Sequence, residues 1–213
     1  PLGVDLSNEQ ALAIAFRHLA GIGFAENMAG HITWQLDGQT DMFVNPWGLW
    51  WQEVTASDIC VVDGDAQVVS GRWDVTPAIH IHTELHRVRD DARVVIHNHP
   101  YYACVLAALG RLPELVHQTG SLFLDDLRLV GTYEGEIDSP ARAAELAARI
   151  GGANMTSLAN HGVIATGRNL PEAVYRAESS ERGCKLAYDV MLTGRDPVAM
   201  DWSDMLGMQR SLI

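Results

Sequence analysis

Hydrophobic residues recur with a helical spacing in five stretches of the chain. The first is the clearest, because apolar residues occupy positions 11, 12, 14, 15 and 19, and Ser7 and Gln10 have the spacing of a capping box. The sequence predicts a helix over 7–22, ended by Gly21 and Gly23. Comparable patterns predict helices over 78–88, 100–109, 139–150 and 171–192.

Between these helices, short runs rich in β-branched residues predict strands. Three pairs of runs each flank a tight-turn sequence: 31–35 with 41–44, 60–62 with 66–69, and 157–159 with 163–165. A further strand is predicted at 93–97. Because tight turns join several strands and helices separate the others, the pattern indicates an α/β fold with a mixed or antiparallel sheet and helices on its faces. We expect one domain over residues 1–213.

Charge and composition narrow the class of function. The formal net charge of −12 disfavours binding to phosphate backbones and anionic lipid, and no apolar run is long enough to cross a bilayer. We therefore expect neither nucleic acid nor a membrane as partner.

Three cysteines without a CxxC spacing favour a cytoplasmic location. The chain lacks a starting methionine and a signal-peptide pattern, so residues 1–3 are expected to be a cleavage scar.

The lysine content bears on the chemistry. Lys185 is the only lysine in the chain, and it lies in a charged stretch of the last predicted helix. A Schiff base requires a lysine in a desolvated pocket, which this position disfavours. If the protein stabilises a carbanion, we expect a group other than an imine to do it.

A pair of histidines at the end of a predicted strand suggests a metal site. His97 and His99 are two residues apart, so their side chains point to the same face of the strand, and Pro100 ends it. Most such pairs are not metal sites, and spacing alone does not connect them to His161, which lies in the turn at 160–162. Three neutral imidazoles with an open position would be a catalytic arrangement for zinc, and they would also accept iron or manganese.

A second group of histidines lies on the helix at 78–88. His82 and His86 share a helix face, but the spacing of the nearby glutamate does not match HExxH. We expect His82 to be packed and hydrogen-bonded, and His86, which neighbours Arg87, to lie at the surface. His80 stays a candidate for proton transfer.

Two segments together resemble the class II aldolase/adducin family: VVIHNHPYYACVL at 94–106 and ANHGVIATG at 159–167. The resemblance covers nearly the whole chain, with further matches at 27–33, 45–48 and 81–90. It implies a three-layer α/β/α sandwich with a mainly antiparallel central sheet. It also implies one divalent metal ion per chain, bound by His97, His99 and His161, and a homotetramer with active sites for small molecules at subunit interfaces.

The sequence departs from the family pattern at several active-site positions. Aldolase members carry an acid/base carboxylate where this chain has Ala78, and an asparagine where it has His31. The two phosphate-binding serines of the family are replaced by Thr76-Pro77, and its phosphate-binding turn is replaced by the sequence NPWG at 45–48. The tyrosine that donates a proton from the neighbouring subunit is matched by Gln118. The resemblance therefore implies a metal site without the standard base and without much of the phosphate cradle.

These departures favour decarboxylation. The substrate of a decarboxylase is already an anion, the metal must stabilise the electron density left behind, and a general acid supplies one proton. We expect a lyase that decarboxylates a small, non-phosphorylated hydroxy-aromatic or keto carboxylate, with His80 or His31 as the acid. The tryptophans at 47, 50 and 51 could offer flat surface to such a substrate, or could simply pack. The substrate-binding candidates are Gly30, Asn45, Trp47, Gly48, Thr76 and Gln118.

Three alternatives stay open. One is a class II aldolase acting on a small aldehyde or ketone. Another is a non-haem iron oxygenase, because three histidines could bind iron(II), and some relatives that lack the acidic residue have been linked to oxidative decarboxylation. The third is a non-catalytic module like the adducin head. The presence of all three expected metal-binding histidines argues against this alternative. The metal, among zinc, manganese and iron, is not fixed by imidazole ligands.

Overall fold

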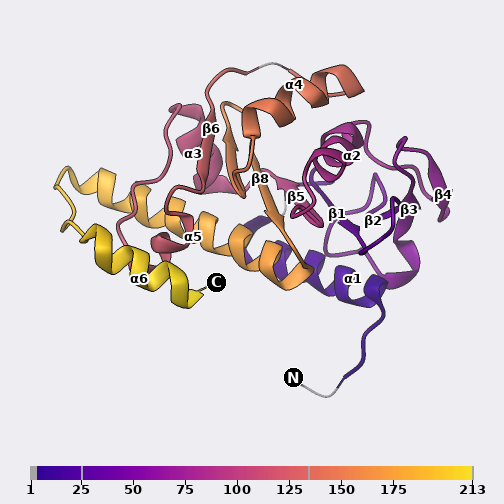
Figure 1. The fold of residues 1–213 in the computed structure, drawn as a ribbon, viewed down its shortest axis with the longest axis horizontal. Coiled ribbons are helices and arrows are strands. Elements are labelled where there is room, and N and C mark those ends of the chain that lie inside the picture. The colour runs from indigo at the N-terminus through magenta and orange to yellow at the C-terminus, as the bar shows by residue number, and fades with distance from the viewer. Residues whose placement is uncertain (1–3, 25, 134, 213) are drawn as a thin grey trace.

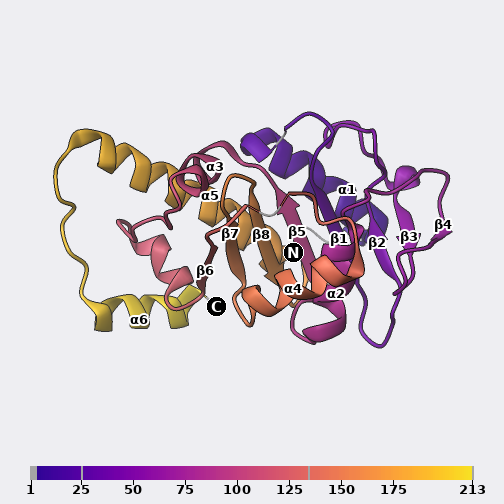
Figure 2. The ribbon, with the colours of Figure 1, turned by 90° about the horizontal axis from the view of Figure 1, so that it is seen from above.

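The computed structural model describes residues 4–24, 26–133 and 135–212. The expected cleavage scar at 1–3 lies outside these residues. The described chain contains one eight-stranded sheet, in the spatial order β4-β3-β2-β1-β5-β8-β7-β6 (Figures 1 and 2). In chain order the strands are β1 (His31–Gln35), β2 (Met42–Val44), β3 (Cys60–Val62), β4 (Val68–Ser70), β5 (Val94–Asn98), β6 (Leu127–Val130), β7 (Met155–Leu158) and β8 (Val163–Gly167).

All neighbouring strands pair antiparallel except β6 and β7, which pair parallel. The expectation of a mainly antiparallel sheet is therefore confirmed. β5 lies in the middle, between β1 and β8, and all five of its residues are buried. Strands buried on both faces read as continuous apolar runs, which is why 93–97 carries the clearest strand signal of the chain.

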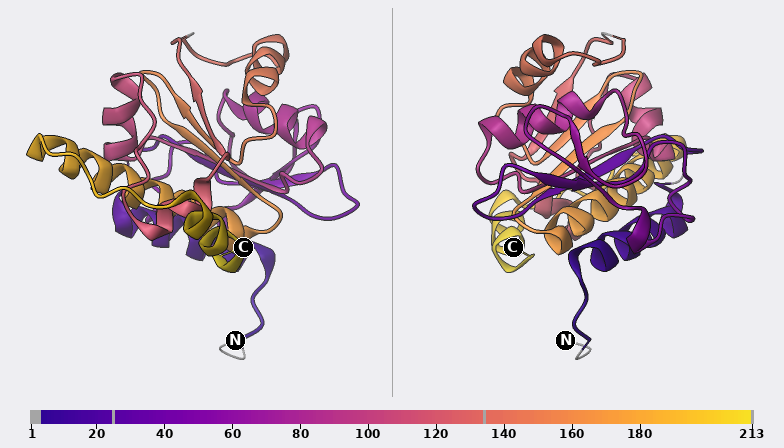
Figure 3. Two further views of the ribbon diagram at one scale, coloured as in Figure 1. Left: turned by 60° about the vertical axis from the view of Figure 1, so that its left-hand side comes forward. Right: turned by 90° about the vertical axis from the view of Figure 1, so that its right-hand side faces the viewer.

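Helices cover both faces of the sheet and complete a three-layer α/β/α sandwich (Figure 3). One face packs against α1 (Asn8–Leu19), α3 (Tyr101–Ala108) and α5 (Leu170–Thr193), and the other against α2 (Ile79–Val88) and α4 (Pro140–Ile150). The pleat of β5 divides the two cores: Val94 and Ile96 belong to the first, and Val95 to the second. His97 follows Val95 with the same parity, so its side chain is on the α2 face.

The predicted helices and strands are all present, with boundaries shifted by a few residues. Ser7 and Gln10 form the expected capping box at the start of α1, and Asn169 caps α5. The hairpin strand predicted at 66–69 is β4 at 68–70, and the strand predicted at 157–159 is β7 at 155–158. Both shifts lie within the usual uncertainty of element ends.

Several elements were not predicted. They are the strand β6, the helix α6 (Trp202–Leu212), the π-helical turn η1 (Ala20–Phe24) and the 3-10 helices η2 (Ala56–Asp58) and η3 (Gln118–Phe123). β6 is a four-residue edge strand interrupted by Arg128, and α6 has a single buried residue, Met205, so neither has a strong pattern. None of the helices in the described ranges combines the length and the apolar character needed to cross a bilayer.

Candidate metal centre and pocket

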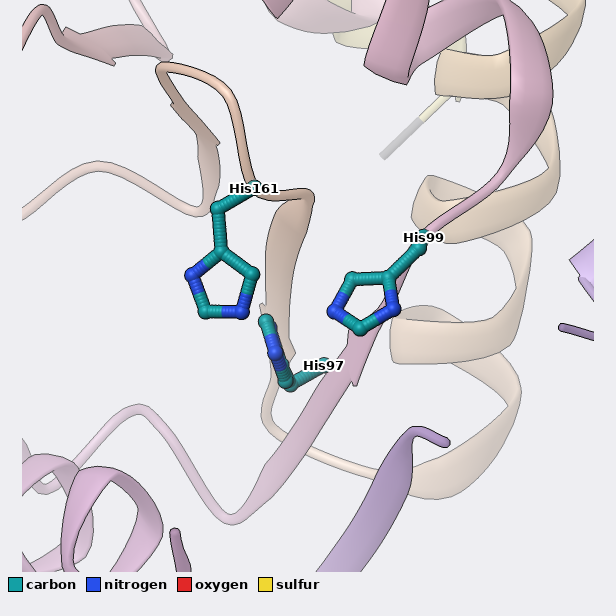
Figure 4. Close-up of side chains that lie close together, drawn as sticks. All are labelled: His97, His99 and His161. Atoms are coloured by element: carbon teal, nitrogen blue, oxygen red, sulfur yellow. The ribbon is translucent and has the colours of Figure 1, made fainter. Parts of the chain in front are cut away.

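Three histidine side chains from two adjacent strand ends converge on one point. His97 is the second-to-last residue of β5, His99 directly follows the strand, and His161 lies in the turn between β7 and β8 (Figure 4). One ring nitrogen from each lies within 4.8 Å of the others. The ring centroids are 5.1 Å apart for His97 and His99, 4.8 Å for His97 and His161, and 5.0 Å for His99 and His161. The structure thus brings together the three residues expected as ligands.

The pairing of β5 with β8 places His161 beside the other two rings. Asn98 lies opposite Val163, so the turn before β8 lies against the end of β5. A side chain at Gly162 could not be accommodated, because its Cβ would lie 2.4 Å from the Asn98 carbonyl oxygen and 2.4 Å from Cδ2 of His99. Glycine at 162 is therefore required for the close approach of His161 to His99.

Hydrogen bonds to Nδ1 orient the rings of His97 and His99 and leave Nε2 of each ring free to bind a metal. Nδ1 of His97 donates to the Val163 carbonyl oxygen at 3.0 Å, and Nδ1 of His99 donates to the Glu26 carboxylate. Nε2 of His99 is buried and has no hydrogen-bond partner among the described residues. A buried imidazole nitrogen without a partner, whose other nitrogen bonds to a carboxylate, is the arrangement found for metal-binding histidines. The residues therefore fit a divalent metal ion.

The electrostatic state of the triad also suits a ligand set. Burial, together with the neighbouring histidines, lowers the pKa of His97 well below its usual value. Burial lowers the pKa of His161 to about 4, assisted by His99 and opposed by Glu26. Both rings are consequently neutral near pH 7, which is the form that binds a metal.

A pocket of about 280 Å³ opens beside the triad. His31, which lies opposite His97 on β1, forms part of its wall, with ring centroids 5.1 Å apart. Ala78, where the family resemblance led us to expect a carboxylate in an aldolase, lines the pocket, and Trp47 in its lining is about half exposed. Of the expected substrate-binding residues, the lining includes Gly30, Asn45, Trp47 and Thr76.

Asn45 also has a structural role. Its side-chain oxygen accepts from the Ile32 backbone N–H at 3.2 Å, and its amide donates to the Gly30 carbonyl oxygen at 3.3 Å. The indole N–H of Trp51 donates to the same carbonyl at 3.1 Å. These bonds fix the start of β1, and with it the position of His31.

Three expected site residues do not line the pocket of the described chain. His80 is half-buried on α2, Gly48 lies beyond Trp47 in its turn, and Gln118 begins η3. Lys185 is likewise absent from the lining, and its ammonium group lies 5.2 Å from the ring centroid of Tyr102.

The expectation for His86 was wrong. It is only 6% exposed, because its ring turns inward and bonds to the Thr33 hydroxyl of β1 at 2.7 Å. The arginines at 87 and 89 suggested a surface position, yet α2 buries the face that His86 shares with His82. His82 is fully buried and hydrogen-bonded, as expected.

Sequence reasoning also missed several residues of the site. Glu26 directly precedes the family match at 27–33, and a carboxylate beside that segment was the signal that could have identified it. Tyr133, Glu136 and Ile137, between β6 and α4, line the pocket as well. They belong to no motif, and only the three-dimensional arrangement places them there.

Comparison with known proteins agrees with this geometry. Residues 10–188 match the family described as Class II Aldolase and Adducin N-terminal domain. A 4-hydroxy-3-prenylphenylpyruvate oxygenase/4-hydroxy-3-prenylbenzoate synthase of Streptomyces roseochromogenus is 30% identical over 204 residues, covering 92% of this chain and 73% of the relative. The decarboxylase NovR of Streptomyces niveus is 33% identical over 168 residues, covering 76% of this chain and 62% of NovR.

Among solved structures, the L-fuculose 1-phosphate aldolase of Glaciozyma antarctica superposes with a TM-score of 0.85 at 23% identity. The match covers 96% of this chain and 80% of that one, and at this identity it shows the fold. The match over 179 residues and the curated relatives together show the family: this chain is a member of the class II aldolase and adducin family.

Proposed function

We propose that the protein is a metal-dependent carbon–carbon lyase that decarboxylates a small, non-phosphorylated hydroxy-aromatic or keto carboxylate. The observation that carries the proposal is the composition of the pocket. It combines three convergent histidines with Ala78 and His31, and no lysine or arginine is found among the described residues that line it. A phosphorylated substrate would lack cationic partners in such a pocket, whereas a carboxylate needs only the metal.

The chain's own residues would divide the work as follows. A divalent metal bound by His97, His99 and His161 would supply a Lewis acid that stabilises the electron density left when carbon dioxide departs. Ala78 leaves space and places no negative charge against the substrate carboxylate. Trp47 offers a flat apolar surface to a ring. When Nδ1 of His31 accepts a hydrogen bond from His82, the hydrogen of His31 is on Nε2, and His31 would donate that hydrogen to the carbon.

An oxygenase is the second candidate. It is favoured by the similarity to the prenylphenylpyruvate oxygenase, which covers 92% of this chain. Three imidazoles with open positions could bind iron(II) as well as zinc or manganese. Aldol cleavage is supported by similarity to L-fuculose phosphate aldolases of Methanococcus maripaludis, 25% identical over 149 residues, but Ala78 leaves that reaction without its carboxylate base.

We also propose a cytoplasmic homotetramer. Gln118 and Gly48 lie outside the pocket of their own chain, and a site completed by a neighbouring subunit would account for Gln118. The thiols of Cys60, Cys104 and Cys184 are free, as expected in a reducing compartment. Light scattering after size exclusion should give four times the chain mass of 23.3 kDa, and the mass of a single chain would contradict the assembly.

The first experiment is elemental analysis of protein purified without chelator or nickel. We expect about one zinc or manganese per chain, lost in the His97→Ala/His161→Ala variant and retained in His18→Ala, whose ring lies at the surface beside Glu178. A panel of hydroxy-aromatic and keto carboxylates should then release carbon dioxide without consuming oxygen. One iron per chain and oxygen consumption would favour the oxygenase instead. Absence of metal would overturn the proposal and favour a non-catalytic module.

A further inference from the structure

A line of four buried polar side chains leads away from the pocket. His31 and Thr33 project from the same face of β1, and His82 and His86 from the same face of α2. Nδ1 of His31 lies 2.8 Å from Nε2 of His82, and Nδ1 of His82 lies 2.8 Å from Oγ1 of Thr33. The same oxygen lies 2.7 Å from Nε2 of His86. All four side chains are at most 7% exposed.

The chemistry of these groups restricts how hydrogens are arranged along the line. A neutral imidazole has one N–H and one bare nitrogen, and a hydroxyl donates one hydrogen while it accepts another. The pKa of His31, of His82 and of His86 is lowered by burial, so the rings are neutral near pH 7. With one hydrogen in each of the three contacts, all donors must point in the same direction along the line.

Two arrangements satisfy this condition. In the first, His86 donates to Thr33, Thr33 donates to His82, and His82 donates to Nδ1 of His31, which leaves the hydrogen of His31 on Nε2. In the second, every donor is reversed, and Nε2 of His31 is bare. Since His31 lines the pocket, the first arrangement presents a hydrogen donor to a substrate and the second an acceptor.

The end of the line far from the pocket is open. Nδ1 of His86 is buried and forms no hydrogen bond among the described residues. The Ala92 backbone raises the pKa of His86 as a hydrogen-bond acceptor and Arg93 lowers it, although no described atom has the geometry of a full hydrogen bond to Nδ1. The Ala92 carbonyl favours a hydrogen on Nδ1, which corresponds to the second arrangement, but without a fully formed hydrogen bond it does not fix the direction of the line.

We propose that Thr33, His82 and His86 are positioning residues that act as one unit and determine whether His31 presents a donor or an acceptor to the pocket. Reversal of the line moves one hydrogen across each of the three contacts. A hydrogen gained at Nε2 of His31 is balanced by one released from Nδ1 of His86 to water, and every ring stays neutral. The role of His31 in turnover rests on the proposed function, whereas the coupling along the line does not.

The direct test is nitrogen NMR of zinc-loaded protein labelled with 15N-histidine, which distinguishes bare from hydrogen-bearing ring nitrogens. His86→Leu leaves the Thr33 hydroxyl only His82 as acceptor, so that hydroxyl should donate to His82 and drive the hydrogen of His31 onto Nε2. In the Thr33→Val background, the same change at His86 should leave His31 unaffected, and in Thr33→Ser it should act as in the wild type. An effect of His86→Leu that persists in Thr33→Val, or a bare Nε2 of His31 in His86→Leu itself, would overturn the coupling.

A kinetic measurement complements the spectra. Thr33→Val should lower kcat about 10–100-fold, because general acid–base catalysis contributes about 10²–10⁴-fold, and KM should stay nearly constant. Thr33→Ser should restore kcat. Thr156→Val is the matched control, since Thr156 is a buried threonine of β7 whose hydroxyl has no partner among the described residues. If no carboxylate is turned over, the proposed function fails while the spectra still decide the coupling. Turnover without coupling in the spectra would overturn only this inference.

Discussion

The Glu26 carboxylate accepts a hydrogen bond from Nδ1 of His99. This contact joins the loop before β1 to the residue that follows β5, and it keeps Nε2 of His99 as the nitrogen without a hydrogen. A carboxylate in this position orients a metal-binding histidine and increases its basicity. The pair formed by His18 and Glu178, 3.1 Å apart, has the same chemistry at the surface and no connection to the pocket.

Removal of the Glu26 carboxylate should weaken metal binding. We expect Glu26→Ala to lower the affinity for zinc by about 10–100-fold, because residues that orient metal ligands typically contribute that much. Competition with a chromogenic chelator would measure the change. Glu178→Ala removes the equivalent carboxylate from the surface pair and should leave the affinity unchanged. Equal affinities for the two variants would show that Glu26 does not orient the ligand.

Restoring a carboxylate at position 78 should suppress decarboxylation. Two unit charges about 4 Å apart repel by about 4 kcal/mol at an effective dielectric constant of about 20. We therefore expect Ala78→Glu to reduce kcat/KM for a carboxylate substrate at least 100-fold relative to Ala78→Gln, which has nearly the same size without the charge. Steady-state release of carbon dioxide would measure both variants. If both lose activity equally, the cause is steric and the electrostatic argument is wrong.

Gly30 should be far less tolerant of a side chain than Gly48, although both have positive φ angles, of 91° and 94°. A Cβ at Gly30 would lie 2.1 Å from Nδ2 of Asn98 and 2.9 Å from the Trp51 ring, whereas a Cβ at Gly48 meets nothing within 4 Å. Gly48→Ala should cost about 1–2 kcal/mol of unfolding free energy through its backbone angle alone. Gly30→Ala should cost about 1–3 kcal/mol more. Chemical denaturation would measure both, and equal costs would contradict the predicted overlap.

The burial of His86 should make stability depend on pH. Burial lowers its pKa in the folded protein to about 4, against 6.5 for a free histidine. Between these values the unfolded chain binds more protons, so the free energy of unfolding falls as the pH decreases from about 6.5 to about 4. His86→Leu should reduce that slope in the metal-free protein by up to about 1.4 kcal/mol per pH unit. Thr156→Val, which removes no titratable group, should leave the slope unchanged, and an unchanged slope in His86→Leu would contradict the prediction.

Local patterns predicted most of the elements and part of the site. His97 and His99 could be paired from the sequence because a strand places residues two apart on one face. The position of His161 beside them depends on the pairing of β5 with β8, which joins residues 65 to 73 positions apart in the sequence, and no local pattern contains that information. Only the resemblance to a family supplied this connection before the fold was known.

The burial of His86 shows a different limit. Its spacing from His82 gives a shared helix face, but the charged neighbours of His86 suggested that this face met solvent. Whether it does depends on what α2 packs against, and the partner is Thr33 on β1, 53 residues earlier. Glu26 was missed for the same reason, since its partner His99 lies 73 residues away.

The walls of the pocket should open on different timescales, because some belong to the central strand β5 and others to loops. Its backbone lies in the middle of the sheet with every residue buried, so its amide hydrogens should exchange with solvent only when the whole sheet unfolds. The walls contributed by Trp47, Tyr133 and Glu136 lie outside helices and strands, and their amides should exchange by local opening. New substrates can therefore be accommodated by changing these loops, while His97 keeps its position for as long as the sheet stays folded.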